Sequence, residues 1–284
     1  MKTTAVCIIN YNTRDLLRDC LHSVVSENPA EIIVVDNAST DGSAEMVEAE
    51  FPPIKLIHLS ENPGYGAAAN RAIMSSRAEH ILLLNSDTCL KPGSLQALSD
   101  YLEANEFAAV VGPRVLNPDG TLQRSAFHFP TPVHIFLYLF KLYSFIRYTP
   151  LLRHRSLQEL PGASAKTVPW VLGAALAFRR SAFDSVGGFD ESFFMYFEEV
   201  DLCYRLTQQG WQIHFAPVTE IVHVGGASTS QRRTEMSAHY FISLAQFYRK
   251  HYSWVRLAQL ALIVNCFTFI GLASKWLKPI GSPS

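Results

Sequence analysis

Residues 81–87 read Ile-Leu-Leu-Leu-Asn-Ser-Asp, an apolar run that ends abruptly in polar side chains. A short run that is apolar at every position is typical of a strand buried on both faces of a parallel sheet. Similar runs occur at 4–10, 31–36, 54–59 and 108–111, with helical patterns between them. This alternation predicts an α/β fold with a mostly parallel central sheet and helices on both faces.

The length and composition are those of a globular protein. The 284 residues allow one large or two small domains, and 48% of them are hydrophobic, enough for a sizeable core. A formal net charge of −1 gives no basic excess, so we expect no nucleic-acid partner. The five cysteines form no Cys-x-x-Cys pair, which indicates reduced, mostly buried thiols and a cytoplasmic location.

Polar side chains follow the predicted strands at the points where these end. Ligands of parallel sheets bind beyond the carboxyl ends of the strands, so these side chains are expected at one edge. Four segments supply them: Asn10 to Asn12, Asp36 with Asn37, the loop from Asn62 to Gly66, and Asn85 with Asp87.

Asp87 and His223 are candidate metal ligands. Proteins hold Mg²⁺ through one or two carboxylates together with phosphate oxygens, so Asp87 at a strand end can hold a cation that also grips a diphosphate. The alternative is an aspartate that caps a following helix. His223 lies among apolar residues and glycines, where a neutral imidazole can bind metal. Its alternative is a buried core histidine.

Residues 64–69 read Gly-Tyr-Gly-Ala-Ala-Ala, which matches the Gly-x-Gly-x-x-Ala pattern of dinucleotide-binding proteins. That pattern belongs after the first strand of the fold, whereas this loop follows the third predicted strand. A dehydrogenase-like enzyme or a nucleotidyltransferase is therefore an alternative interpretation. The sequence has no Gly-x-x-x-x-Gly-Lys-Ser/Thr motif, which argues against a Walker-type NTPase.

Residues 187–205 place five carboxylates among aromatic and large apolar side chains. Burying such groups is costly, so the stretch either builds ion pairs or tunes acids for chemistry. Asp201 and Arg205 are four apart on a predicted helix, which favours a structural ion pair. Glu198 and Glu199 are adjacent and point about 100° apart on a helix, so we expect only one of them to face a cleft.

In their order along the chain, five segments of residues 4–230 resemble glycosyltransferase family 2, and within it the bacterial rhamnosyltransferase-like branch. These segments are 10–13, 34–43, 62–66, 83–87 and 187–205. The resemblance implies a GT-A fold, whose central sheet is Rossmann-like, and inversion at the anomeric carbon. It also implies a nucleotide-sugar donor, linked to dTDP or UDP, and a divalent metal, Mg²⁺ or Mn²⁺.

The same resemblance assigns roles to individual residues. It implies donor binding by nine of them: Asn10, Asn12, Asp36, Asn37, Asn62, Gly64, Asn70, Asn85 and Asp87. It places Trp170, Gly173 and Ala174 at the acceptor, and Asp87 with His223 at the metal. Glu199 stands where the family commonly has an aspartate as catalytic base, and Glu198 is the other candidate. The chain departs from the family at Asn85, where the metal motif commonly begins with an acid.

The resemblance implies an inverting glycosyltransferase of cell-surface polysaccharide synthesis, with rhamnose as one candidate sugar. The acceptor is expected to be a saccharide or a polyprenyl-linked molecule. We expect a catalytic domain at 1–230, with a nucleotide-sugar half at 1–115 and an acceptor half at 116–230. Besides the other nucleotide-binding enzymes named above, a catalytically degenerate binding partner is an alternative.

The C-terminal residues 231–284 are expected to form a helical, membrane-associated tail. Within it, 257–274 has 18 residues without a formal charge, which is near the lower length for a spanning helix. Its polar side chains favour a helix that lies in the membrane interface, with spanning and buried helices as alternatives. The aromatic run at 133–148 is a second candidate membrane contact. We therefore expect a peripheral protein at the inner face of the cell membrane.

Overall fold

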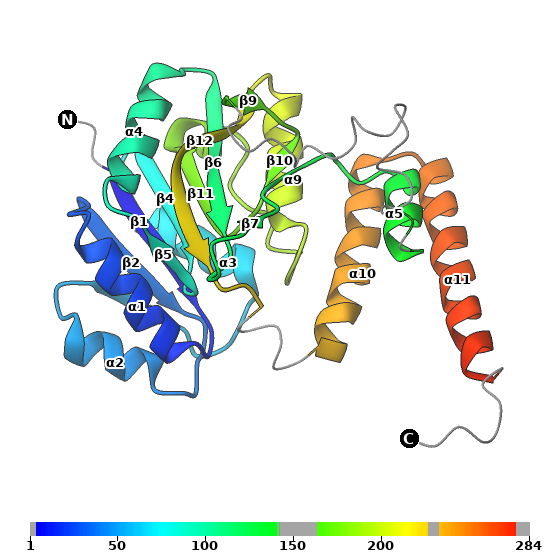
Figure 1. Cartoon of the computed structure of the whole chain (residues 1–284), viewed down its shortest axis with the longest axis horizontal. Coiled ribbons are helices and arrows are strands. Elements are labelled where there is room, and N and C mark those ends of the chain that lie inside the picture. The colour runs from blue at the N-terminus through cyan, green and yellow to red at the C-terminus, as the bar shows by residue number, and fades with distance from the viewer. Residues whose placement is uncertain (1–3, 141, 143–163, 227–232, 277–284) are drawn as a thin grey trace. The chain divides into compact units, whose positions relative to one another are not determined.

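The structure is a computed structural model that describes residues 4–140, 142, 164–226 and 233–276 (Figure 1). The described residues group into two units. The first takes those of 1–129 and 157–243, and the second those of 130–156 and 244–284. The division expected at residue 230, and the donor and acceptor halves before it, stay predictions.

Strands and helices alternate through the first part of the first unit. In order they are β1 (Thr4–Asn10), α1 (Arg14–Val25), β2 (Glu31–Asp36), α2 (Ser43–Glu50), β3 (Lys55–His58), α3 (Tyr65–Met74), β4 (His80–Asn85), β5 (Thr88–Leu90), α4 (Ser94–Ala104) and β6 (Ala108–Leu116). The five strands expected from apolar runs are all present, whereas the three-residue β5 is too short to leave a pattern.

The rest of the unit contains several two-residue strands, two longer strands that join the main sheet, and two helices. In order they are β7 (Leu122–Gln123), β8 (Ala126–Phe127), β9 (Lys166–Thr167), β10 (Trp170–Val171), β11 (Ala175–Arg179), α8 (Arg180–Ser185), α9 (Glu198–Gln208) and β12 (Gln212–His223). A single strand was expected over 168–180. The structure instead has two strands there, because β10 pairs with β8 in a separate small sheet whereas β11 joins the main sheet. The residues between them line a cavity.

The main sheet has the strand order β3-β2-β1-β4-β11-β6-β12-β5. Strands β1 to β4 pair in parallel, and β6 pairs in parallel with β12. Strand β11 lies antiparallel between β4 and β6, and β5 is antiparallel to β12. The predicted α/β fold with a mostly parallel central sheet is confirmed.

Both faces of the sheet are covered, which explains why its strands are apolar at successive positions. Along β1, Ala5, Cys7 and Ile9 belong to one core cluster. Val6 and Ile8 face the other. Helices α3, α8 and α9 contribute to the first cluster, and α1, α2 and α4 contribute to the second (Figure 1). Side chains alternate between the faces of a strand, so covering both faces requires an unbroken apolar run.

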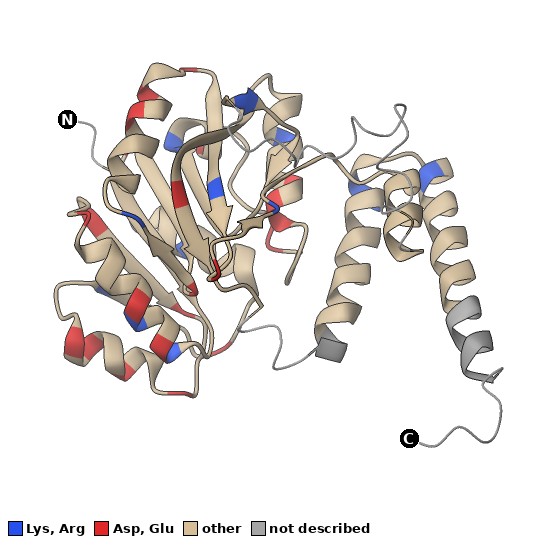
Figure 2. Ribbon diagram, in the orientation of Figure 1, with Lys and Arg blue, Asp and Glu red and all other residues tan. Residues whose placement is uncertain are grey.

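Helix α10 (Arg233–His251) contributes residues to both units. The second unit also contains α5 (Pro132–Leu139) and α11 (Trp254–Trp276). The ring of Phe140, directly after α5, packs against that of Phe267 on α11, with centroids 5.7 Å apart. Figure 2 shows no acidic residue on α5 or α11. Among the described residues, no helix has the length and apolar character needed to cross a bilayer. Residues 141 and 143–148 of the aromatic run lie outside the described residues.

Candidate active site

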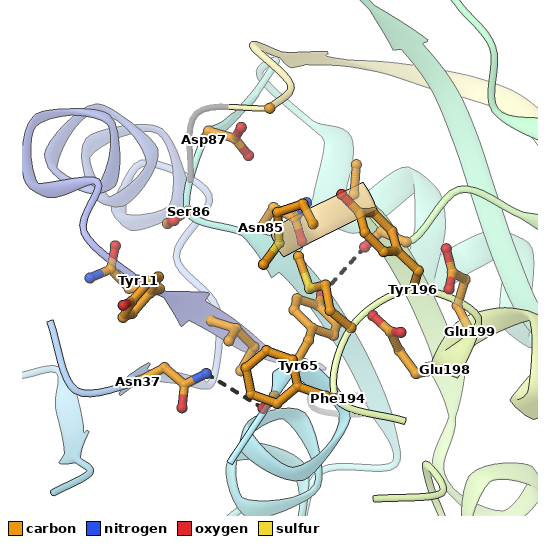
Figure 3. A pocket seen from close by; sticks show the side chains of 18 of the residues that line it. Tyr11, Asn37, Tyr65, Asn85, Ser86, Asp87, Phe194, Tyr196, Glu198 and Glu199 are labelled. Atoms are coloured by element: carbon orange, nitrogen blue, oxygen red, sulfur yellow. Dashed lines mark hydrogen bonds between the residues drawn. The ribbon is translucent and has the colours of Figure 1, made fainter. Parts of the chain in front are cut away.

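A cavity of about 350 Å³ lies at the carboxyl ends of the parallel strands (Figure 3). Eleven of the residues expected at the site line it: Asn10, Asn37, Asn62, Gly64, Asn85, Asp87, Gly173, Ala174, Glu198, Glu199 and His223. They come from β1, β4, β12, α9 and the loops beside them. Four others, Asn12, Asp36, Asn70 and Trp170, are absent from the lining.

Asp36 and Asn12 hold the strand ends together. Asp36 is fully buried, and its Oδ1 accepts a 2.8 Å hydrogen bond from Asn10 Nδ2. Its Oδ2 accepts from the Ser39 amide at 3.0 Å and lies 3.2 Å from His58 Nδ1. Asn12 adopts a left-handed φ of 52°, and its Oδ1 accepts from the Thr40 amide at 2.8 Å. Both side chains thus fix the loop that follows β2.

Asn37 lines the cavity and has a side-chain oxygen without a hydrogen-bond partner among the described residues. Asn62 Oδ1 accepts from the Gly64 amide at 2.9 Å, so the Asn37 atom that also faces it, 2.8 Å away, must be the donor Nδ2. The amide of Asn37 is therefore oriented without ambiguity. Its Oδ1 is buried and has no hydrogen-bond partner among the described residues. Asn85 Oδ1 is a second buried acceptor in the lining without such a partner.

Asn70 and Trp170 support the site from outside the cavity. Asn70 Nδ2 donates to Phe189 O and to Glu191 Oε1, both at 2.9 Å, and Asn70 Oδ1 accepts from the Phe189 amide. Trp170 stacks on Phe127, with ring centroids 4.3 Å apart. The roles assigned to Asn70 and Trp170 at the donor and acceptor stay predictions.

The loop before α9 is strained and aims two glutamates into the cavity. Tyr196 and Phe197 both have left-handed φ angles, 66° and 68°, which non-glycine residues adopt rarely. Glu198 and Glu199 follow in the first turn of α9, and both line the cavity. Only one was expected there. The difference arises because the left-handed residues bring the chain into the helix along the cavity wall.

Burial changes the acidity of both glutamates. Burial raises the pKa of Glu199 from 4.5 to about 7, although hydrogen bonds that its carboxylate accepts from backbone amides, including that of Gly173, act in the opposite direction. Burial first, and then the charge of Glu199, raises the pKa of Glu198 well above its usual range. One oxygen of each carboxyl, Oε2, has no hydrogen-bond partner among the described residues. In Figure 3, Glu198 and Glu199 lie on one side of the group of lining side chains, and Tyr11 and Asn37 lie on the opposite side.

Asp201 and Arg205 form the predicted ion pair, 2.7 Å between Arg205 Nε and Asp201 Oδ2. Arg205 also donates to the backbone oxygens of Val186, at 2.6 Å, and Gly188, at 2.7 Å. Asp201 is fully buried and lies outside the cavity lining. Of the five acids of residues 187–205, Glu198 and Glu199 thus line the cavity and Asp201 belongs to the structural ion pair. Asp190 accepts from the Ser192 hydroxyl, and Glu191 accepts from Asn70.

Asp87 and His223 are brought together at one end of the cavity. Asp87 Oδ1 lies 3.2 Å from His223 Nε2, and Asp87 Oδ2 accepts from the Gly225 amide at 3.2 Å. An octahedral Mg²⁺ ion with bonds of about 2.1 Å separates neighbouring ligand atoms by about 3.0 Å, so this oxygen and nitrogen fit such an ion. The part of the chain that the structure describes holds no group of three or more acidic, histidine or cysteine side chains that could bind a metal.

Some lining residues left little signal in the sequence. Tyr65 lies inside the glycine pattern, and its hydroxyl is 3.4 Å from Gly173 O. Met236 and His239 come from α10, far along the chain, and His239 stacks on Phe194 at 4.6 Å between ring centroids. No motif pointed to these two residues.

Comparison with known proteins identifies the family. Residues 5–187 match the family described as Glycosyl transferase family 2. The chain belongs to glycosyltransferase family 2. It is 32% identical over 248 residues to the N-acetylglucosaminyl-diphospho-decaprenol L-rhamnosyltransferase of Mycobacterium tuberculosis, covering 82% of this chain and 80% of that one. This glycosyltransferase is thus a transferase of the rhamnosyltransferase-like kind expected from its sequence.

Solved glycosyltransferases share its GT-A fold. A mannosyltransferase from Pyrobaculum calidifontis in complex with GDP-Man and Mn²⁺ has a TM-score of 0.60 and 17% identity, over 99% of this chain and 76% of that one. GalNAc-T7 with UDP, GalNAc and Mn²⁺ has a TM-score of 0.57 and 18% identity, over 78% of this chain and 44% of that one. At such identities the likeness shows the fold alone.

Proposed function

We propose that this glycosyltransferase inverts the anomeric carbon of a UDP- or dTDP-linked hexose, with rhamnose as the first candidate, and that Glu199 is its catalytic base. The observation that carries the proposal is the pair of glutamates, one buried and one half-buried, that face the strand ends across one cavity. The relative from Mycobacterium tuberculosis supports the sugar and a polyprenyl-linked acceptor, because its name specifies both.

The acidity of Glu199 supports it as the base. A pKa of about 7 leaves about half of the Glu199 carboxyl ionised at neutral pH. Burial and the charge of Glu199 raise the pKa of Glu198 well above its usual range. In the proposed step, the acceptor hydroxyl oxygen attacks the anomeric carbon and its proton passes to Glu199 Oε2. The bond from that carbon to the diphosphate oxygen breaks, and the nucleoside diphosphate leaves with both electrons. A base placed in this way contributes about 10²–10⁴-fold to the rate.

Asp87 and His223 would hold the divalent metal ion, Mg²⁺ or Mn²⁺. Their oxygen and nitrogen, 3.2 Å apart, are a suitable pair of ligands, and Asn85 Oδ1 is a nearby buried acceptor. When bound, such an ion offsets the negative charge that develops on the departing diphosphate.

The oriented amide of Asn37 supports a uracil or thymine base. Its unpaired oxygen can only accept a hydrogen bond, and the N3–H group of these bases is a donor. Cytosine has an acceptor at the same position, so it would leave two acceptors face to face. Leaving a buried polar group unpaired costs about 1–3 kcal/mol, which corresponds to roughly 5- to 150-fold in affinity.

The second unit supports peripheral attachment to the inner face of the cell membrane. Trp254 and Leu262 on α11 are 79% and 65% exposed, and Tyr138 on α5 is 59% exposed. Neither helix contains an acidic residue, and Arg256 adds positive charge. Apolar area with basic residues is the pattern that binds anionic lipid surfaces. We expect the full chain to sediment with phosphatidylglycerol vesicles, and a Trp254→Glu, Leu262→Glu variant to remain in the supernatant.

Nucleotide binding tests the proposed function with a matched pair of ligands. Calorimetry with Mn²⁺ present should show UDP or dTDP binding roughly 5- to 150-fold more tightly than CDP. Asn37→Leu, which removes the acceptor, should reduce this preference. Equal binding of UDP, dTDP and CDP by the wild-type chain would remove Asn37 from base recognition. Transfer of hexose only from GDP- or ADP-linked donors would overturn the proposed donor class.

A further inference from the structure

A series of hydrogen-bonded side chains runs from the turn between β6 and β7 to the ring of His223. It consists of Asp119, Thr121, Asn117 and Gln123. These four residues lie outside the five segments that resemble the family. Each is held in place locally, because Asn117 and Thr121 close the turn through a 2.8 Å backbone hydrogen bond and Gln123 pairs with Val115 of β6.

The donor and acceptor of each hydrogen bond follow from the carboxylate of Asp119, which lies at the opposite end of the series from His223. Side-chain and backbone hydrogen bonds from Thr121 lower the pKa of Asp119, so its carboxylate is ionised and only accepts. The Thr121 hydroxyl must therefore donate its single hydrogen to Asp119 Oδ1, 2.6 Å away. Its oxygen is then an acceptor, and the Asn117 atom 2.9 Å from it is the donor Nδ2.

The same reasoning continues to the histidine. With Asn117 Nδ2 turned to Thr121, Asn117 Oδ1 accepts from Gln123 Nε2 at 3.0 Å. Gln123 Oε1 is then the atom that faces His223 Nδ1, 2.6 Å away. An amide oxygen cannot donate, so Nδ1 must carry a hydrogen. In the neutral ring, Nε2 is left with its lone pair, 3.2 Å from Asp87 Oδ1.

We propose that Gln123, held by Asn117 and Thr121, is a positioning residue that fixes the Nδ1–H tautomer of His223 and so directs the Nε2 lone pair toward a divalent cation shared with Asp87. Two facing acceptors repel each other unless a proton or a metal cation lies between them, and the hydrogen bond to Gln123 prevents the neutral ring from avoiding this by moving its proton from Nδ1 to Nε2. Partners of this kind behind a metal ligand are typically worth 10- to 100-fold in metal affinity.

The tautomer can be read directly, without metal, donor or catalysis. In the full chain labelled with ¹⁵N-histidine, the ring nitrogen shifts of His223 report which nitrogen carries the hydrogen, and His223→Gln assigns the signals. At a pH high enough for the ring to be neutral, the wild-type ring should be the Nδ1–H tautomer. Gln123→Leu, which removes the acceptor, should lose that preference, and Gln123→Glu, which keeps an oxygen, should retain it. A wild-type ring with its hydrogen on Nε2 would overturn the inference.

Binding of Mn²⁺ alone, followed by electron paramagnetic resonance of the free ion, tests the consequence. This part rests on the proposed metal site, so Asp87→Asn and His223→Gln are measured beside Gln123→Leu. Gln123→Leu should weaken Mn²⁺ binding 10- to 100-fold. Unchanged affinity in Gln123→Leu, while Asp87→Asn and His223→Gln bind weakly, would overturn the positioning role alone. Unchanged affinity in all three variants would instead overturn the proposed metal site.

Discussion

Glu199→Gln should stabilise the folded chain at alkaline pH, because it removes a carboxylate that burial disfavours. The pKa of Glu199 is raised from 4.5 to about 7 in the fold. The folded state therefore binds the proton more tightly than the unfolded state, and stability falls as pH rises from about 4.5 to about 7. Each pKa unit corresponds to about 1.4 kcal/mol, so the full cost above pH 7 is about 3 kcal/mol.

Glutamine is neutral at every pH and has nearly the same shape, so the variant lacks this cost. Thermal unfolding should give similar Tm values for both proteins at pH 4.5, and a Tm higher by roughly 6–12 °C for Glu199→Gln at pH 8.5. Glu48→Gln on the exposed side of α2 is the matched control and should leave the Tm unchanged. A Tm difference between Glu199→Gln and the wild type that stays constant from pH 4.5 to 8.5 would refute the reasoning.

Three further experiments test the supporting structure. Gly64→Ala should lower stability by roughly 1–3 kcal/mol in denaturant unfolding, because φ is +99° and the added Cβ would lie 2.4 Å from Phe194 O. Gly93→Ala, with φ of +81° but nothing within 4 Å, is its control and should cost less. Asp201→Asn should cost about 3–5 kcal/mol in the same assay, because it leaves the charge of Arg205 unpaired; a loss below 1 kcal/mol would count against a structural pair. Iodoacetamide labelling at pH 8, followed by mass spectrometry, should modify the exposed Cys266 but not Cys7 or Cys20. Burial raises the pKa of both of these thiols to about 12, so they stay protonated. Rapid labelling of Cys7 or Cys20 in the folded chain would contradict their burial.

The strand ends could be predicted from the sequence because each is a local pattern. An apolar run such as 81–84 followed by Asn85 and Asp87 needs only its own residues to indicate a buried strand with polar groups at its carboxyl end. The ion pair of Asp201 with Arg205 is also local, since it joins successive turns of one helix.

Features that depend on distant parts of the chain could not be predicted. Met236 and His239 reach the cavity from α10, whose sequence carries no motif. The presence of both Glu198 and Glu199 in the cavity depends on left-handed backbone before α9, which aromatic residues rarely adopt. The hydrogen bond of Gln123 to His223 joins residues one hundred positions apart and exists only because β6 lies between β7 and β12 in the sheet.

The most direct test of the central claim is the pH dependence of sugar transfer by wild type, Glu199→Gln and Glu198→Gln. With a UDP- or dTDP-hexose donor, kcat/KM of the wild type should rise with pH up to about 7 and then level off, because the base must be ionised. Glu199→Gln should reduce kcat by about 10²–10⁴-fold and abolish this dependence, while donor affinity persists. Two results would contradict the assignment of Glu199 as the base. One is full turnover by Glu199→Gln, and the other is a rise of kcat/KM up to pH 7 that is lost in Glu198→Gln but kept in Glu199→Gln.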